Sequence, residues 1–182
     1  MKKILSKTIF WFIGWKAIGS FEYPRKCVVI AAPHTSNWDF VIGRLYVYIT
    51  GINARYLIKS SLFLPVIGSF FRWDGGIPVN RSSKNNIVDI MVAKFNNTDS
   101  FILGIAPEGT RSRVDRWKTG FYHIAYKANV PIVLVGLDFK HKQVGVINSF
   151  IPTGDIDNDI IYIREQFKHI EGKIPRNYNQ DY

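Results

Sequence analysis

Cysteine is nearly absent from the sequence, whose 182 residues contain one, Cys27. A single cysteine excludes a disulfide within the chain. Cys27 lies inside the apolar run 27–32, where a small buried hydrophobic residue is more common than a reactive thiol. We therefore expect neither a disulfide framework nor a cysteine nucleophile. The composition is compatible with a reducing compartment.

The sequence also lacks an uninterrupted apolar segment that could cross a bilayer. Residues 1–20 come nearest, but Lys7 and Lys16 interrupt them, and a span needs about 20 apolar residues. No clean cleavage site follows, so the segment matches a signal peptide poorly. Its lysines and tryptophans, with the apolar residues 9–13, predict a helix over 1–20 that lies in the membrane interface. A helix packed on the domain or on a dimer partner fits the same pattern.

Several signatures of catalysis and cofactor binding are missing. The chain has no Gly-x-Ser-x-Gly elbow, no P-loop and no dinucleotide-binding fingerprint. His123, His141 and His169 have no cysteine or acidic partner at metal-ligand spacing. We therefore expect no metal site and no bound cofactor.

Acidic residues are few, since 14 Asp and Glu stand against 24 Lys and Arg, and the formal net charge is +10. Such a surface attracts anionic lipids, phosphorylated substrates, acidic proteins or nucleic acid. A nucleic-acid reader would typically show a helix-turn-helix, or a sheet of exposed aromatics with interleaved basic residues. Neither pattern is evident, so we expect no nucleic-acid partner. The aromatic fraction of 15% suits the boundary between water and lipid headgroups.

Apolar runs that alternate with helical patterns predict one α/β domain over residues 21–182, with a mixed, partly parallel sheet flanked by helices. Strands are expected at 27–32, 54–58, within 75–81, at 100–106 and 130–137, and at the sheet edge over 143–150. Helices are expected at 40–50, 85–95, 119–128 and 155–170, followed by a loosely structured tail. Residues 60–73 are rich in large apolar side chains, and Pro65 breaks a helix at their middle. That segment suits an apolar groove, a membrane-facing patch or a plain core turn.

Residues 33–39, Pro-His-Thr-Ser-Asn-Trp-Asp, lie between the strand 27–32 and the helix 40–50. The carboxyl ends of strands are where open α/β sheets bind ligands. There a neutral His34 can take a proton from a hydroxyl, and Asp39 can hold its tautomer and stabilise the imidazolium. The same residues also fit a helix start, with Ser36 as N-cap and Asp39 as a capping-box acid.

A second polar segment follows the strand 100–106, so it reaches the same edge of a parallel sheet as His34. Glu108, Gly109, Thr110 and Arg111 offer a close backbone approach, hydrogen-bond donors and a cation that can hold phosphate. Arg81, which also follows a strand, is a second candidate cation. A solvated basic loop, with Glu108 paired to Arg111, fits the pattern as well.

With these residues in view, the chain resembles the glycerolipid acyltransferase family, whose best-known activity is acylation of lysophosphatidic acid. Residues 34–39 match its histidine-four residues-aspartate (HX4D) signature, and residues 76–81 resemble its second block. Residues 107–112 match its third block closely, and residues 130–133 its fourth. Four blocks in this order make the resemblance specific.

The resemblance implies a glycerolphosphate acyltransferase-like fold and transfer of a fatty acyl group from acyl-CoA or acyl carrier protein to a lysophospholipid hydroxyl. His34 would be the general base and Asp39 its support. Arg111 and Arg81 would hold the acceptor's phosphate or carboxylate, and Glu108, Gly109 and Thr110 would complete that pocket. The protein would sit on an anionic membrane, at its cytoplasmic face, as a peripheral or monotopic enzyme.

Two departures from the family pattern concern the acceptor. Pro33 stands where many members have asparagine, and Ala106 replaces a common phenylalanine. The chain is also shorter than many relatives. A lyso amino-acid lipid is therefore an alternative acceptor, and a non-catalytic lipid- or phosphate-binding protein is an alternative class.

Overall fold

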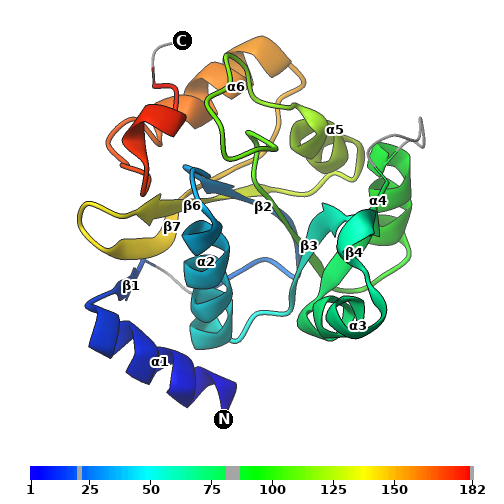
Figure 1. Ribbon diagram of the computed structural model, residues 1–182. Helices are drawn as coiled ribbons and strands as arrows, with labels where there is room; N and C mark the ends of the chain where they lie inside the picture. The colour runs from blue at the N-terminus through cyan, green and yellow to red at the C-terminus, as the bar shows by residue number, and fades with distance from the viewer. Residues whose placement is uncertain (20–21, 81–86, 181–182) are drawn as a thin grey trace.

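The computed structural model describes residues 1–19, 22–80 and 87–180. Within these ranges seven strands form one sheet in the order β1-β7-β6-β2-β5-β3-β4 (Figure 1). Their bounds are β1 Lys16–Ile18, β2 Lys26–Ala32, β3 Ala54–Lys59, β4 Gly76–Val79, β5 Phe101–Ile105, β6 Ile132–Asp138 and β7 Gln143–Phe150. Neighbouring strands are parallel except β6 and β7. The prediction of a mixed, partly parallel α/β sheet is confirmed.

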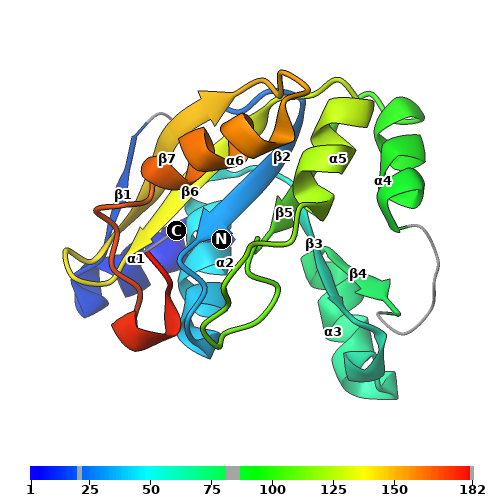
Figure 2. The ribbon, with the colours of Figure 1, turned by 90° about the horizontal axis from the view of Figure 1, so that it is seen from above.

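Helices cover both faces of this sheet (Figure 2). On one face lie α1 (Lys2–Ile13) and α2 (Asn37–Thr50). On the other lie α4 (Ile87–Asn96), α5 (Gly120–Lys127) and α6 (Ile156–Glu165). The helix α3 (Pro65–Asp74) stands beside β4, after the short 3₁₀ turn η1 (Ser60–Leu62), and a second 3₁₀ turn, η2 (Pro175–Asn177), lies near the C-terminus.

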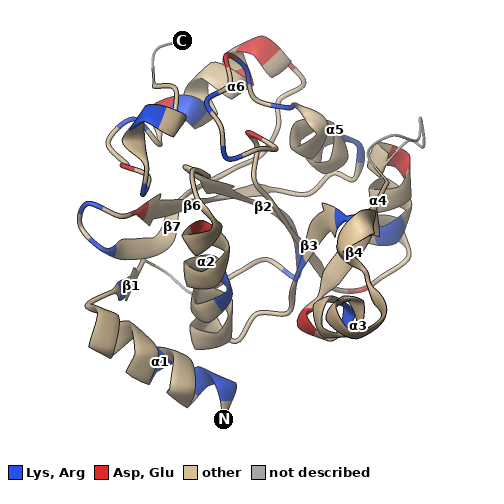
Figure 3. Ribbon diagram, in the orientation of Figure 1, with Lys and Arg blue, Asp and Glu red and all other residues tan. Residues whose placement is uncertain are grey.

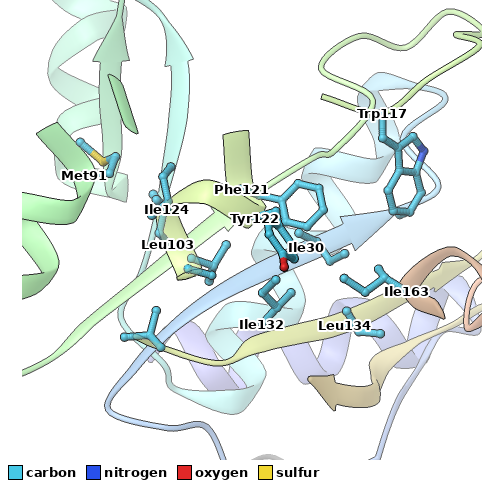
Figure 4. Packing of buried hydrophobic residues seen from close by; sticks show 14 of the residues in the cluster. Ile30, Met91, Leu103, Trp117, Phe121, Tyr122, Ile124, Ile132, Leu134 and Ile163 are labelled. Carbon is cyan, nitrogen blue, oxygen red and sulfur yellow. The ribbon is translucent and has the colours of Figure 1, made fainter. Parts of the chain in front are cut away.

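The alternation of side chains along the central strands produces two apolar cores. On β2, Val28 and Ile30 face the α4–α6 side, whereas Cys27 and Val29 face the α1–α2 side. Because both faces are covered, the strand reads as a continuous apolar run in the sequence. Figure 4 shows the first core, where Phe121 of α5 packs over the sheet.

At the N-terminus, the prediction of a helix over residues 1–20 is wrong for residues 14–19, and residue 20 lies outside the described residues. Gly14 adopts a left-handed conformation, with φ of 73°, and ends α1 by donating its N–H to the last carbonyls of the helix. Residues 16–18 then form β1, which pairs in parallel with β7. The expectation that residues 143–150 form an edge strand is therefore wrong as well, because β1 pairs with residues 143–145 and takes the edge position. No helix in the described ranges is long and apolar enough to span a membrane.

The C-terminal prediction needs two corrections. The helix expected over 155–170 ends at Glu165, and the tail beyond it is ordered rather than loose. Tyr178 and Asn179 are buried, and their neighbours are far away in the sequence, which is why local pattern did not reveal them. Elsewhere, Pro65 does not break a helix but begins one, since it is the first residue of α3.

Candidate active site

The turn between β2 and α2 joins the two roles that the sequence suggested for residues 34–39. Ser36 is the N-cap of α2, and its hydroxyl accepts a hydrogen bond from the Trp38 N–H at 3.1 Å. Asp39 completes a capping box, accepting the N–H groups of Thr35 at 2.5 Å and Ser36 at 2.7 Å on its Oδ2 atom. The same Oδ2 atom lies 3.2 Å from Nδ1 of His34. The helix start therefore aims the carboxylate at the imidazole.

This geometry suits proton transfer by His34. Asp39 is buried, whereas the His34 side chain is 23% exposed. The imidazole is therefore accessible to a substrate while a buried carboxylate holds its Nδ1 side. A carboxylate at Nδ1 favours the tautomer that carries its proton there, which leaves the Nε2 lone pair available as a base.

Glu108 fixes the main chain of the same turn. Its Oε1 atom accepts the His34 N–H at 2.9 Å, and the residue is 3% exposed. Its Oε2 atom is buried without a hydrogen-bond partner in the part of the chain that the structure describes. Burial raises the pKa of this carboxyl from 4.5 to about 7. No ion pair joins Glu108 to Arg111, although the structure describes both, so the suggested pairing within the loop is wrong.

A cavity of about 550 Å³ opens beside this turn. His34 and Asp39 line it together with Gly109 and Lys118 from the loop between β5 and α5. Most of its other walls are apolar and come from the sheet, α2 and the loop after α2, among them Val29, Val47, Ile52, Leu57, Ile105 and Val135. A largely apolar cavity of this size, with an imidazole in its wall, can hold a hydrocarbon chain.

The cavity also contains a cation that is already paired. Arg44 of α2 lines the wall, and its Nε atom lies 2.9 Å from Oδ2 of the buried Asp74. Tyr48 and Tyr56 donate their hydroxyl groups to the same carboxylate. Sequence reasoning missed this cluster because its members lie on three separate elements.

The remaining predicted site residues are placed differently. Thr110 and Arg111 are exposed and do not line the cavity. The Thr110 hydroxyl accepts the Ser112 N–H within the loop, at 3.3 Å. Arg81 lies outside the described residues. The structure thus brings His34, Asp39, Glu108 and Gly109 together, and the substrate roles of all these residues stay predictions.

Sequence reasoning missed Lys118 and the C-terminal segment as parts of the site. Lys118 had a weak signal, because it closes the basic stretch after Arg111. The C-terminal segment had none, yet Ile174 donates its N–H to the Thr35 hydroxyl at 3.2 Å and Asn177 its side-chain amide to the Thr35 carbonyl at 3.4 Å. Figure 2 shows this segment beside the start of α2.

Comparison with known proteins matches residues 18–138 to the family model described as Acyltransferase. The chain belongs to the Acyltransferase family. The acyltransferase domain is similar to the 1-acyl-sn-glycerol-3-phosphate acyltransferases of Saccharomyces cerevisiae, at 28% identity over 66% of this chain and 41% of the relative, and of Salmonella typhimurium, at 30% identity over 65% and 49%. The matched region thus spans under half of each of these relatives.

The fold of the acyltransferase domain is also known from a solved structure. The crystal structure of the 1-acyl-sn-glycerophosphate (LPA) acyltransferase PlsC from Thermotoga maritima superposes with a TM-score of 0.64 at 18% identity, covering 90% of this chain and 74% of that one. At that identity the likeness shows the fold alone.

Proposed function

We propose that the protein transfers a fatty acyl group from acyl-CoA or acyl carrier protein to the free hydroxyl of a lysophospholipid such as 1-acylglycerol-3-phosphate. The observation that carries this proposal is the His34 imidazole, supported by Asp39 at 3.2 Å, on the wall of a largely apolar cavity. The names of the relatives support the same acceptor. Catalysis needs no cofactor beyond the thioester donor.

In the proposed reaction His34 Nε2 takes the proton of the acceptor hydroxyl as its oxygen attacks the thioester carbonyl. The tetrahedral intermediate collapses, the C–S bond breaks, and the imidazolium returns the proton to the leaving thiolate. Asp39 stabilises the imidazolium while it exists. General base catalysis of this kind contributes about 10²- to 10⁴-fold in rate.

Direct transfer between donor and acceptor is favoured over an acyl-enzyme. Cys27 is fully buried, and burial raises the pKa of its thiol to about 12, so it is a poor nucleophile. The Ser36 hydroxyl accepts the Trp38 N–H and donates to the Asp39 carboxylate, so both of its hydrogen-bonding roles are occupied. Neither side chain is poised to carry an acyl group.

The test is an acyl-transfer assay with purified protein. Acyl-CoA or acyl carrier protein and a panel of lyso-lipids, including 1-acylglycerol-3-phosphate and a lyso amino-acid lipid, should yield free thiol and diacyl product. His34→Ala should lower kcat at least 10²-fold, and Asp39→Asn should lower it as well. The exposed His123→Ala serves as the matched control and should keep full activity.

Retention of most activity by His34→Ala would remove this residue as the base. Absence of transfer to every lyso-lipid of the panel, with binding retained, would favour a non-catalytic lipid-binding protein. The acceptor that reacts fastest identifies the headgroup.

We further propose that the protein works on the cytoplasmic face of a membrane, as a peripheral or monotopic enzyme. On α1, Ile4, Leu5, Trp11 and Phe12 are between 60% and 76% exposed. The segment from η1 through α3 also presents exposed apolar residues, namely Leu62, Leu64, Val66, Ile67, Phe70 and Trp73. Large apolar patches on a protein surface mark interaction sites, and Lys and aromatic residues suit a lipid interface.

The two apolar patches are held next to each other. Lys2 Nζ lies 3.4 Å from the centroid of the Trp73 ring and 4.8 Å from that of Tyr48, so it bridges the start of α1 and the end of α3. Figure 1 places α1 and α3 along the same side of the molecule. The described part of α1 carries lysines and no acid, which suits an anionic lipid surface.

A further inference from the structure

The cavity beside His34 extends onto both faces of the sheet. One part, the α2 lobe, is lined by side chains of the core on the α1–α2 side, among them Val29, Tyr46, Val47, Ala54 and Val135. The other part, the α5 lobe, is lined by side chains of the core on the α4–α6 side, among them Leu57, Ile87, Ile105, Phe121 and Ile124. The cavity therefore has two apolar compartments on opposite sides of one sheet.

The two lobes join where the sheet parts between β3 and β5. Among the residues that the structure describes, β3 pairs with β5 over Ala54–Tyr56 only and then follows β4 as far as Lys59. The next residues of the two strands, Leu57 and Ile105, both line the cavity. Strands that stayed paired would lie about 4.8 Å apart and would close this passage. Figure 2 shows β3, β4 and α3 standing apart from β5.

The proposed base lies next to this opening. Glu108, shortly after the end of β5, accepts the His34 N–H at 2.9 Å. This bond holds His34 beside the carboxyl end of β5, which is the end at which β3 has already left β5. A group that reacts at His34 therefore lies near the point where the two lobes meet.

The α2 lobe lies toward the proposed membrane surface. Arg44 in its wall pairs with Asp74 at the end of α3. Tyr48, which donates its hydroxyl to Asp74, has the ammonium of Lys2 from α1 over its ring. Figure 3 shows the basic start of α1 on the same side of the molecule as α3. The α5 lobe lies on the other face of the sheet, where α4 and α5 pack.

We propose that each lobe holds one hydrocarbon chain, the α2 lobe the acceptor's own chain and the α5 lobe the chain that is transferred. Acyl transfer to a lysolipid brings two chains to one base, and two apolar lobes that meet beside His34 meet that need. The acceptor arrives from a bilayer, so its chain enters the lobe next to α1 and α3. A water-soluble donor brings its chain to the other face. The assignment rests on the proposed acyl transfer and the proposed membrane surface.

Two glycines allow the lobes to be tested separately. Gly43 of α2 and Gly120 of α5 both line the cavity, and a Cβ atom built on either meets no other atom within 4 Å. Gly43→Leu and Gly120→Leu should therefore each fill part of one lobe without displacing the main chain. The matched control is Ala93→Leu, which adds the same side chain at an exposed position of α4 outside the cavity.

Steady-state kinetics with octanoyl and palmitoyl chains on each substrate measure the effect. Gly43→Leu should lower the preference for a palmitoyl over an octanoyl acceptor about tenfold and leave the preference between donors as it is. Gly120→Leu should lower the preference for the palmitoyl donor to the same extent and leave the preference between acceptors as it is. Each methylene kept out of an apolar site costs about fourfold in affinity, so the loss of two accounts for this change.

Three results would overturn the proposal. If both variants change the preference for the same chain, the two lobes do not hold different chains. If their effects equal that of Ala93→Leu, the cavity holds neither chain. If Gly43→Leu acts on the donor and Gly120→Leu on the acceptor, the assignment of the chains is wrong.

Calorimetric binding to the full chain separates this site from catalysis. The S-decyl thioether of CoA or of acyl carrier protein, which cannot donate an acyl group, should bind together with 1-decanoylglycerol-3-phosphate. Gly120→Leu should weaken binding of the first ligand, and Gly43→Leu binding of the second. This pattern in a protein that transfers no acyl group would support the two chain sites and refute the enzyme. Competition between the two ligands, in a protein that does transfer, would refute the two chain sites alone.

Discussion

The carboxylate of Asp39 serves the start of α2 and the imidazole of His34 at once. It accepts two main-chain N–H groups of the turn while its Oδ2 atom lies 3.2 Å from the His34 ring. Charge-assisted bonds of this kind are stronger than neutral ones, so the carboxylate is rigidly held. We therefore expect Asp39→Asn to destabilise the start of α2 as well as to lower activity. Thermal unfolding of the variant measures the first effect, and kcat measures the second.

Glu108 gives a prediction about stability and pH. Its pKa is raised from 4.5 to about 7 by burial, so the folded state holds this proton more tightly than the unfolded state. The stabilisation is complete below pH 4.5 and is lost as the pH rises through 7. Glu108→Gln keeps an acceptor for the His34 N–H and cannot ionise.

The free energy of unfolding of Glu108→Gln, relative to the native chain, should therefore increase by about 3 kcal/mol between pH 4.5 and pH 8. Urea denaturation of both proteins at several pH values measures the difference. Parallel pH curves for the two proteins would contradict a raised pKa at this site.

The proximity of His34 and Asp39 could be predicted from the sequence because one short motif contains both residues and the capping residue Ser36. Their geometry is local, set by a strand end and a helix start. The sequence could not show in this way whether Arg111 or Lys118 lines the cavity. Both belong to one basic loop, and only the course of that loop over Gly109 decides which side chain lines the cavity.

At the scale of elements, the C-terminal segment 171–179 holds together several parts of the site. It contacts the β6–β7 turn through the Phe139 N–H, which donates to the Glu171 carbonyl, and the motif turn through Thr35. Its Asn179 accepts from Arg113 of the loop after β5. We therefore expect this segment to help position the turn that carries His34, although it lies far from that turn in the sequence.

Gly172 offers a sharp test of this element. A Cβ atom there would come within 2.7 Å of Thr35 Cγ2 and 2.8 Å of Thr35 Oγ1, so Gly172→Ala should displace the turn that carries His34. We expect kcat to fall about tenfold to a hundredfold with little change in KM, because small misplacements of a catalytic group are costly. Thr35→Val, which removes the acceptor for the Ile174 N–H, should act in the same direction, and Thr35→Ser should restore much of the rate.

Steady-state kinetics and thermal unfolding of each variant measure the effect. The variant Gln180→Ala, at the exposed residue directly after this segment, should behave like the native chain. Full activity of Gly172→Ala, or a loss explained by unfolding at the assay temperature, would contradict a positioning role.

Elements with a clear period were predictable, and elements defined by distant contacts were not. The central strands and the helices after them follow from apolar runs and helical spacing. The strand β1 has three residues, too few for a pattern, and exists because β7 offers it an edge. The C-terminal segment likewise owes its order to Thr35, more than a hundred residues earlier.

At the scale of the whole molecule, the apolar surface formed by α1 and the η1–α3 segment leads to a prediction about membrane binding. The pair Trp11→Ser and Phe12→Ser, and separately the pair Val66→Ser and Phe70→Ser, should each weaken binding to anionic vesicles at least tenfold. Each removes two side chains that are more than half exposed, and burying such a side chain contributes about 1.5–3 kcal/mol.

Flotation with anionic vesicles measures this binding, and transfer to a soluble short-chain acceptor checks that the fold is intact. The matched control is the pair Ile151→Ser and Ile161→Ser, which are as exposed but lie outside the two patches. Equal binding by all variants would rule out this surface. Substitutions are preferable to deletion of residues 1–18, which would also remove β1.

The pairing of β1 with β7 means that β1 can join the sheet only after residues 143–150 have been synthesised. Residues 16–18 leave the ribosome on the order of ten seconds before the strand they join, residues 143–150, is synthesised. Until then β1 has no sheet edge to complete. The proposed docking of α1 on a bilayer does not need that edge, so this proposal allows α1 to reach the membrane before the sheet closes.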